Sequence, residues 1–380
     1  MCNKCALCDV TLDSSNNSAE HVIPNAIGGF KKVTGFICNS CNNKTGHTWD
    51  TVLCKQFEQI GFLLQIKRER GELRHLDFAT VDGNKIRILG DGSLTYTDPV
   101  VTFEESDDMA KISIQARNLK EAKNIIAGKY KKIKRERPAA NITEPNDIDF
   151  IQTERELESP LHINLSYGGN IAGKSIVKSA LALTYDSGVD VSCCTKALEF
   201  INNDHYGYFG FYYDSKDIIL NRPAAIPLHC VHVQGDPATG LILGYVEYFG
   251  HARFVLLLSD CYSGEKFSNT YAINPLTGCV LDINASIVLT KSQLDDAFSK
   301  NLYDQDVVSQ CYNETFRLIR ELDIKREIHK RLNKIIDETM DGFGVEDLSD
   351  LSEEQIEILS GNISSNLADL IARNIGKQRR

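Results

Sequence analysis

The sequence lacks a long hydrophobic run. Its longest strongly apolar stretch is FVLLL at residues 254–258, far short of the roughly 20 residues that a membrane-spanning helix needs. The N-terminus is polar and carries cysteines, without the positively charged and then apolar segments of a secretory leader. From these absences we expect a cytoplasmic protein that does not enter a membrane.

The chain also lacks an excess of positive charge. It has 42 Lys and Arg against 52 Asp and Glu, a formal net charge of −10, which argues against a protein that coats nucleic acid along its whole length. The basic residues are concentrated locally, because residues 119–138 hold eight basic residues against two acidic ones. We predict an amphipathic helix from Asn118 to Arg137. Its charge is typical of a solvated helix face and would also neutralise DNA phosphates.

The chain is too long for one hydrophobic core. At 380 residues two domains are the default and three are also compatible, and we predict the divisions 1–75, 76–145 and 146–380. The last division contains apolar runs joined by short turns, such as GLILGYVEYFGHARFVLLLSDCY, and hairpins of this kind form antiparallel sheets. It ends in segments with helical periodicity, the last of which is predicted to start at Ser352 with a capping box formed with Gln355. The predicted fold class is therefore α+β.

The twelve cysteines do not suggest disulfides, because seven of them are scattered without a pattern in a large chain that we expect not to be secreted. The informative ones are two CxxC pairs, Cys5 with Cys8 and Cys38 with Cys41. Each CxxC turn brings two thiolates to one ion, and two turns complete the tetrahedral sulfur set of a structural zinc site. We therefore predict a structural Zn²⁺ at these four residues. Cys2 offers an alternative pair with Cys5.

The segment between the two CxxC pairs carries polar residues with catalytic potential. Glu20 and His21 lie in SAEHVIPNAIGGF, and Asn42 and Asn43 follow Cys41 at the predicted start of a helix near Asn42. Zinc would fix both ends of this segment and also the start of the helix. We expect an imidazole, a carboxylate and a carboxamide to lie close together there.

These motifs resemble those of a known family. Cys-x2-Cys, then Glu-His-x-Ile-Pro with Gly-Gly shortly after, then Cys-x2-Cys-Asn-x3-Gly, are similar as a set to the zinc-knuckle subgroup of HNH endonucleases, over about residues 2–55. The resemblance implies a small zinc-stapled ββα-metal nuclease domain, followed here by a larger region of antiparallel sheet and helices. It also implies hydrolysis of DNA phosphodiester bonds.

The resemblance assigns roles by position. His21 would be the general base that deprotonates the attacking water, since an imidazole titrates near neutrality. Glu20 and Asn42 match the positions that hold one catalytic divalent ion, Mg²⁺ or Mn²⁺. That ion would bind the scissile phosphate and stabilise the charge that develops in the transition state.

The sequence departs from the family pattern in places. Many members carry Asp where Glu20 stands and His where Asn42 stands. Asn25 is the nearest counterpart of the middle Asn of the family name. His47 and Asp50, one to two turns into the predicted helix, are candidates for a further ligand to the ion.

A second motif points to another class of protein. GGNIAGKS, Gly168 to Ser175, satisfies the Walker A pattern, in which backbone N–H groups cradle phosphates. The preceding HINLSYGG alternates apolar and polar residues, whereas a strand that leads into such a loop is normally apolar on both faces. Asp260, the candidate Walker B residue, ends a hairpin strand. We favour a glycine turn that leads into a helix over 175–185, with nucleotide binding as an alternative.

The motifs together predict a metal-dependent HNH endonuclease acting on DNA. Residues 76–145 would connect it to a C-terminal regulatory or target-recognition domain over 146–380. By analogy with the family the context is bacterial or phage, such as restriction or antiviral defence. A zinc-knuckle module that binds nucleic acid without catalysis is the main alternative. A homo-oligomer and a small-molecule or protein activator of the C-terminal domain stay open as partners.

Overall fold

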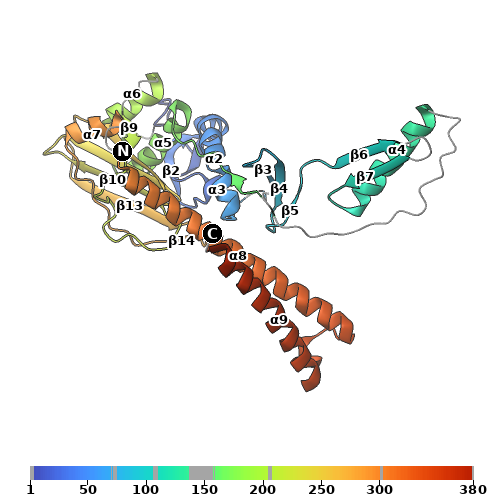
Figure 1. Ribbon diagram of the computed structural model, residues 1–380. Coiled ribbons are helices and arrows are strands. Elements are labelled where there is room, and N and C mark those ends of the chain that lie inside the picture. The colour runs from blue at the N-terminus through green and yellow to red at the C-terminus, as the bar shows by residue number, and fades with distance from the viewer. Residues whose placement is uncertain are drawn as a thin grey trace. The chain divides into compact units, whose positions relative to one another are not determined.

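A computed structural model describes residues 4–69, 71, 75–105, 110–136, 157, 159–203, 208–299 and 303–378 (Figure 1). The chain divides into two compact units, one made of residues 1–70 with residues 167–380 and one made of residues 71–166. The N-terminal segment and the C-terminal region therefore share a unit, although the second unit lies between them in the sequence. The division into functional domains at residues 75 and 145 stays a prediction.

The N-terminal segment folds as an antiparallel hairpin followed by helices. Its elements are β1 (Asn17–His21), η1 (Asn25–Ile27), β2 (Lys32–Cys38), α1 (Asn39–Thr45), η2 (Gly46–Asp50), α2 (Thr51–Gln56) and α3 (Glu58–Leu63). In the hairpin Glu20 lies opposite Val33, and His21 lies opposite Lys32. Buried apolar side chains, Phe36 and Leu53 among them, form the core of the segment. This order of two strands and a helix agrees with the predicted ββα arrangement.

The C-terminal region is built on a six-stranded antiparallel sheet with the strand order β14-β13-β10-β11-β12-β9. Its strands are β9 (Phe209–Phe211), β10 (His229–Asp236), β11 (Leu241–Tyr248), β12 (Ala252–Ser259), β13 (Phe267–Asn274) and β14 (Cys279–Val280). Short turns connect β10 to β11 and β11 to β12, so neighbouring strands run antiparallel. The α+β fold class predicted from these hairpins is confirmed.

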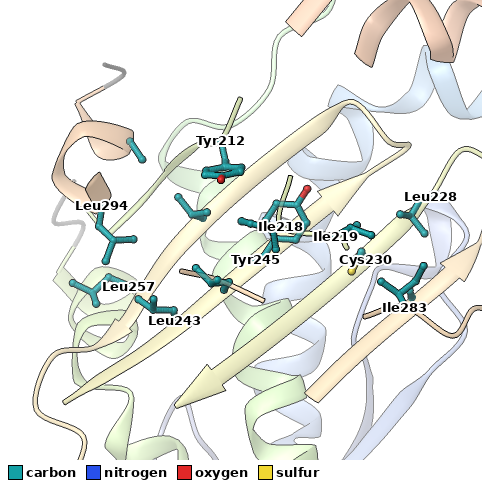
Figure 2. Packing of buried hydrophobic residues seen from close by; sticks show 14 residues of the cluster. Tyr212, Ile218, Ile219, Leu228, Cys230, Leu243, Tyr245, Leu257, Ile283 and Leu294 are labelled. Carbon is teal, nitrogen blue, oxygen red and sulfur yellow. The ribbon is translucent and has the colours of Figure 1, made fainter. Parts of the chain in front are cut away.

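Both faces of this sheet are covered. On one face the strands contribute Cys230, Leu243, Tyr245, Val255 and Leu257 to a buried apolar cluster, which loops and α7 (Lys291–Phe298) close from outside (Figure 2). On the other face lies α5 (Asn170–Asp186). A Cβ atom at Gly244 would lie only 3.3 Å from Cβ of Ala180, so the glycine lets this helix approach the sheet closely.

Helix α5 lies between the sheet and the N-terminal segment (Figure 1). It contacts β10 and β11 on one side and β2, η2 and α2 on the other. Its residues from Ala172 to Thr184 are buried except for Lys174, as expected for a helix that is covered all round. The helix begins five residues before the predicted start at residue 175. It is the main structural link between the two parts of this unit.

Further helices complete the unit. They are η3 (Val191–Cys193), α6 (Thr195–Asn203), α8 (Gln305–Phe343), η4 (Leu348–Asp350) and α9 (Glu353–Gln378), and α8 and α9 pack side by side (Figure 1). Ser352 and Gln355 form the predicted capping box before α9, each side chain bonding the other's backbone N–H. No helix among the described residues has the length and apolarity to cross a membrane.

The second unit has a four-stranded antiparallel sheet in the order β5-β4-β3-β8 and a separate hairpin of β6 and β7. The strands are β3 (His75–Thr80), β4 (Lys85–Leu89), β5 (Leu94–Tyr96), β6 (Val100–Glu105), β7 (Ala110–Gln115) and β8 (Leu161–His162). Helix α4 (Leu119–Glu136) matches the predicted basic helix, and none of its residues is buried.

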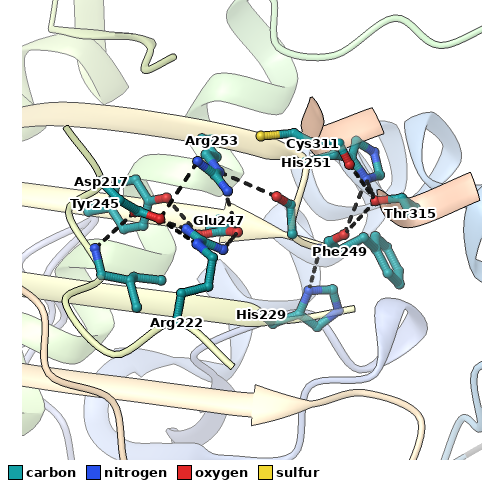
Figure 3. Close-up of polar contacts among 12 residues, drawn as sticks. Asp217, Arg222, His229, Tyr245, Glu247, Phe249, His251, Arg253, Cys311 and Thr315 are labelled. Carbon is teal, nitrogen blue, oxygen red and sulfur yellow. Dashed lines mark hydrogen bonds and ion pairs between the residues drawn. The ribbon is translucent and has the colours of Figure 1, made fainter. Parts of the chain in front are cut away.

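Charged residues of the C-terminal region are connected by ion pairs and hydrogen bonds (Figure 3). Glu247 is fully buried and accepts hydrogen bonds from the guanidinium of Arg222 at 2.6 and 2.9 Å and from the hydroxyl of Tyr245 at 2.6 Å. Arg222 also pairs with Asp217, and Arg253 lies 3.6 Å from Glu247. Each of these four charges therefore has a partner of opposite sign, which offsets the cost of removing it from water.

A buried histidine joins the sheet to the N-terminal segment. Nδ1 of His229 in β10 accepts the backbone N–H of Phe249 at 3.0 Å (Figure 3), and Nε2 lies 2.7 Å from the carbonyl oxygen of Ile27. Nε2 must carry the proton, because a carbonyl oxygen can only accept. The ring is neutral in the fold, and burial lowers its pKa to about 4.

We predict that His229 makes the fold sensitive to acid. Its pKa is about 4 in the fold and about 6.5 in the unfolded chain, so the unfolded chain binds more protons between these values and stability falls as the pH falls. Between pH 6.5 and 5 the free energy of unfolding should drop by about 1.6 kcal/mol from this group. Urea denaturation across this range should show a shallower pH slope for His229→Gln than for wild type, and equal slopes would contradict the prediction.

Candidate functional site

The four cysteines of the two CxxC pairs converge. Their Sγ atoms all lie within 4.8 Å of one another, and those of Cys8 and Cys38 are 3.8 Å apart. A tetrahedral zinc site with Zn–S bonds of about 2.3 Å places its sulfurs roughly 3.8 Å apart. The cluster of Cys5, Cys8, Cys38 and Cys41 therefore matches a structural zinc site in both residue type and spacing. Cys2 lies outside the described residues.

Backbone N–H groups support the sulfurs. The N–H of Cys38 points to Sγ of Cys5 at 3.3 Å, and that of Cys41 points to Sγ of Cys38 at 3.4 Å. Such bonds stabilise thiolates, the form that binds metal. Cys38 also caps α1, which explains why this helix begins at Asn39 and not near Asn42. The cluster thus ties the start of the chain to the junction of β2 and α1.

The two predicted catalytic residues of β1 point in different directions, because side chains alternate along a strand. Ser18 and Glu20 are buried on one side of the strand, whereas Asn17, Ala19 and the half-buried His21 occupy the alternate positions. The carboxylate of Glu20 faces inward and the imidazole of His21 does not share that direction. Glu20 and His21, the last two residues of β1, therefore leave the strand in opposite directions.

Glu20 meets a lysine from the C-terminal region. Nζ of Lys178 in α5 lies 2.6 Å from Oε1 of Glu20 and 2.6 Å from Oδ2 of Asp50, and it donates to Oγ1 of Thr45 at 3.2 Å. Oδ1 of Asp50 accepts from the hydroxyl of Ser175 at 2.5 Å. Three oxygens from β1, α1 and η2 therefore surround one ammonium group.

A π-helical turn places Asp50 in this cluster. In a regular α-helix, residues five apart point about 140° away from each other. Thr45 and Asp50 nevertheless face the same ammonium group, because η2 is a π-helical turn inserted between α1 and α2. Turns of this kind are often found at functional sites.

The charges in this cluster influence one another. Burial raises the pKa of Glu20, and Lys178 partly offsets that effect. Burial also works against the charge on Lys178, but Asp50 and Glu20 outweigh it and raise its pKa. The lysine is therefore the charged member that holds the cluster together.

Asn42 faces the same side of β1 as Glu20. Its Nδ2 donates to Oγ of Ser18, and its backbone carbonyl accepts from Oγ1 of Thr45 at 3.2 Å. With Nδ2 engaged in this way, Oδ1 is the atom of Asn42 that is suited to bind a cation.

His21 has an unsatisfied buried atom. Its Nε2 is shielded from solvent and makes no hydrogen bond to any described residue, and the nearest charged oxygen is Oε2 of Glu69 at 3.8 Å. Burial lowers the pKa of His21, and Lys32 on the paired strand lowers it further, whereas Glu69 raises it. The lowered pKa favours the neutral ring at neutral pH, and Nε2 has no hydrogen-bond partner among the described residues.

The other candidates have different roles. Asn25 donates to the carbonyl of Gly29 and accepts the backbone N–H of Glu69, so it holds two loops together. His47 is exposed in η2. Lys178 and Glu69 were not found from the sequence, because neither belongs to a local motif of the N-terminal segment.

The Walker A residues have structural partners. Residues 170–175 lie inside α5 and form no loop. Nζ of Lys174 donates to the carbonyl oxygen of Ile201 at 2.8 Å, and Ser175 is fully buried against Asp50. The backbone of Gly168 is bonded on both sides by the side chain of Gln56. The geometry gives the nucleotide-binding alternative no support.

We predict that zinc is required for the fold of this segment. Cys38→Ser should abolish a content of about one zinc ion per chain and expose the segment to protease, because structural zinc sites contribute folding energy directly. Elemental analysis and limited proteolysis measure both effects. The exposed Cys279 provides the matched control, and its change to Ser should alter neither. A zinc content unaffected by Cys38→Ser would contradict the assignment.

Of the comparisons with known proteins, one gives a match, and it covers the N-terminal segment. No curated protein and no solved structure matches the sequence. Residues 5–58, which contain the four-cysteine cluster, Glu20, His21, Asn42 and Asp50, match the family model of HNH endonucleases.

Proposed function

We propose that this protein is a metal-dependent endonuclease that hydrolyses DNA, with its active site in residues 5–58. The match to the HNH endonuclease family model supports the reaction class, hydrolysis of phosphodiester bonds. The observation that carries the site is the buried Nε2 of His21, which has no hydrogen-bond partner among the described residues. A buried polar atom without a partner costs free energy and is expected where it serves a function.

His21 is the proposed general base. Its neutral ring can accept the proton of an attacking water, and its lowered pKa keeps it neutral at physiological pH. Glu69, 3.8 Å away, would stabilise the imidazolium that forms. This division of roles resembles that of other catalytic histidines, in which a carboxylate orients the ring.

Glu20 and Asn42 are the proposed ligands of the catalytic ion. Oxygen ligands of this kind suit Mg²⁺ or Mn²⁺. When bound, the ion would stabilise charge on the scissile phosphate. Asp50, which contacts the same ammonium group of Lys178 as Glu20, supplies a further oxygen. Zinc in the cysteine cluster has four protein ligands and would hold the fold without taking part in the reaction.

We predict that His21→Ala lowers the rate of DNA cleavage by roughly 100- to 10,000-fold, the usual contribution of a general base. The assay follows nicking of supercoiled DNA with Mg²⁺ or Mn²⁺. His329→Ala removes an exposed histidine in α8 and should cleave like wild type. Equal cleavage by the His21 variant would refute the catalytic assignment. If wild type binds DNA but does not cut it, the protein is a binding module.

Helix α4 is the proposed anchor for the DNA backbone. Residues 119–136 hold seven basic and two acidic side chains, and the lysines of the helix are exposed. Over 18 residues the helix spans about 27 Å, enough to follow several phosphates along one strand. Contacts of this kind provide affinity without sequence preference.

We predict that neutralising this helix weakens DNA binding and its salt dependence. Lys129→Gln with Lys131→Gln should lower the slope of log affinity against log salt by about 0.9 for each phosphate that the variant no longer neutralises. Fluorescence anisotropy over a salt series measures the slope. Lys266→Gln with Lys325→Gln makes the same charge change at exposed positions elsewhere and serves as the control. An unchanged slope for the α4 variant would exclude this helix from the interface.

The biological setting and the control of the enzyme remain predictions of the family resemblance. A restriction or antiviral role, and regulation by residues 146–380, follow from analogy and from the packing of α5 against the nuclease segment.

A further inference from the structure

One cation is already in contact with Glu20, a proposed ligand of the catalytic ion. The ammonium group of Lys178 has three hydrogens and three oxygen neighbours, on Glu20 and Asp50 at 2.6 Å and on Thr45 at 3.2 Å. Only 1% of the residue is exposed. A group of hard oxygen ligands around a single positive charge is also the environment that a divalent ion requires.

We infer that Lys178 occupies the place of the catalytic ion and that the ion must displace it before the enzyme can act. This inference rests on the proposed function, because Glu20 is the proposed ligand. Oε1 of Glu20 is within contact distance of Nζ, so an ion bound to the same oxygen would lie against the ammonium group. Two cations at such a distance repel strongly in a buried site. The lysine and the ion therefore exclude each other.

We call the contacts of Lys178 with Glu20 and Asp50 the lock. The helix that carries this lysine belongs to the core of the C-terminal region. Ser175 and Lys178, one turn apart on α5, bind the two carboxylate oxygens of Asp50. The neighbouring residues Ile176, Val177 and Ala180 are buried. Because these neighbours are buried, the ammonium group of Lys178 cannot simply swing out into solvent. Displacement requires either a new rotamer of Lys178 or a shift of α5 relative to β1 and η2.

This arrangement would connect metal binding to the state of the C-terminal region. Helix α5 contacts the sheet through β10 and β11 and contacts the nuclease segment through η2 and α2. Any event that moves α5 changes the distance between Lys178 and the two carboxylates. An event at the sheet would thereby control the entry of the ion into the nuclease pocket.

The test measures ion binding without DNA. Zinc-loaded wild-type protein and Lys178→Met are titrated with Mn²⁺ by calorimetry, and their melting temperatures are recorded with and without Mn²⁺. We expect Lys178→Met to bind Mn²⁺ at least about tenfold more tightly and to show a larger rise in melting temperature than wild type at the same Mn²⁺ concentration, because the competing ammonium is gone. Equal Mn²⁺ affinities of the two folded proteins would overturn the inference.

Two variants control for the site. Lys174→Met removes a lysine one turn earlier on the same helix, whose Nζ binds the carbonyl of Ile201, and should bind Mn²⁺ like wild type. Adding Glu20→Gln to Lys178→Met should reverse the gain in Mn²⁺ affinity. A gain that persists in this double variant would place the ion elsewhere and would also overturn the inference.

A measurement on wild type keeps the test independent of the fold of the variant. Saturating Mn²⁺ should increase labelling of Lys178 by an amine-reactive reagent, read by mass spectrometry, because the displaced ammonium must leave its buried position. Unchanged labelling would contradict displacement.

The cleavage assay separates the two proposals. Tighter Mn²⁺ binding by Lys178→Met with no cleavage by either protein would support the lock and refute the nuclease. Cleavage by wild type with equal Mn²⁺ affinities would support the nuclease and refute the lock.

Discussion

The buried ammonium of Lys178 is the contact on which the arrangement of the unit depends. It joins β1 through Glu20, α1 through Thr45 and η2 through Asp50, while its own helix packs against the sheet. Loss of the lysine would leave two acidic groups buried side by side, and loss of either acid would leave the lysine underpaired. One side chain therefore contacts three elements of the N-terminal segment from the C-terminal region.

The N-terminal segment needs stabilising contacts from the rest of the chain, since the 54 residues that match the family model are too few to stabilise a core alone. The cysteine cluster supports one end. The C-terminal region supports the rest, through the bond of His229 to Ile27, the hydroxyl of Tyr271 that accepts the N–H of Lys31, and the ion pair of Lys31 with Asp186 at 2.8 Å. The segment is therefore part of the larger unit, in spite of its compact motif.

Local chemistry explains what could be predicted from the sequence. The CxxC spacing fixes the cysteine cluster, short turns fix the antiparallel strands, and Ser352 with Gln355 fixes the start of α9. The cluster around Lys178 could not be predicted, because it joins residues more than 120 positions apart and depends on a π-helical turn. The strand alternation that separates Glu20 from His21 is visible in the sequence, but only once β1 is known to be a strand. The roles of these residues stay proposals.

The Walker A pattern shows why a motif needs its structural context, since each of its residues has a packing role in this fold. Gly168 has a φ of +82°, a conformation that favours glycine. A Cβ atom at Gly173 would lie 2.4 Å from the ring of Phe209, so only glycine leaves room for that ring. Lys174 and Ser175 bind Ile201 and Asp50. The glycines that would cradle a phosphate in a loop instead let a buried helix start and pack closely, and this helix places Lys178 beside the carboxylates of the N-terminal segment.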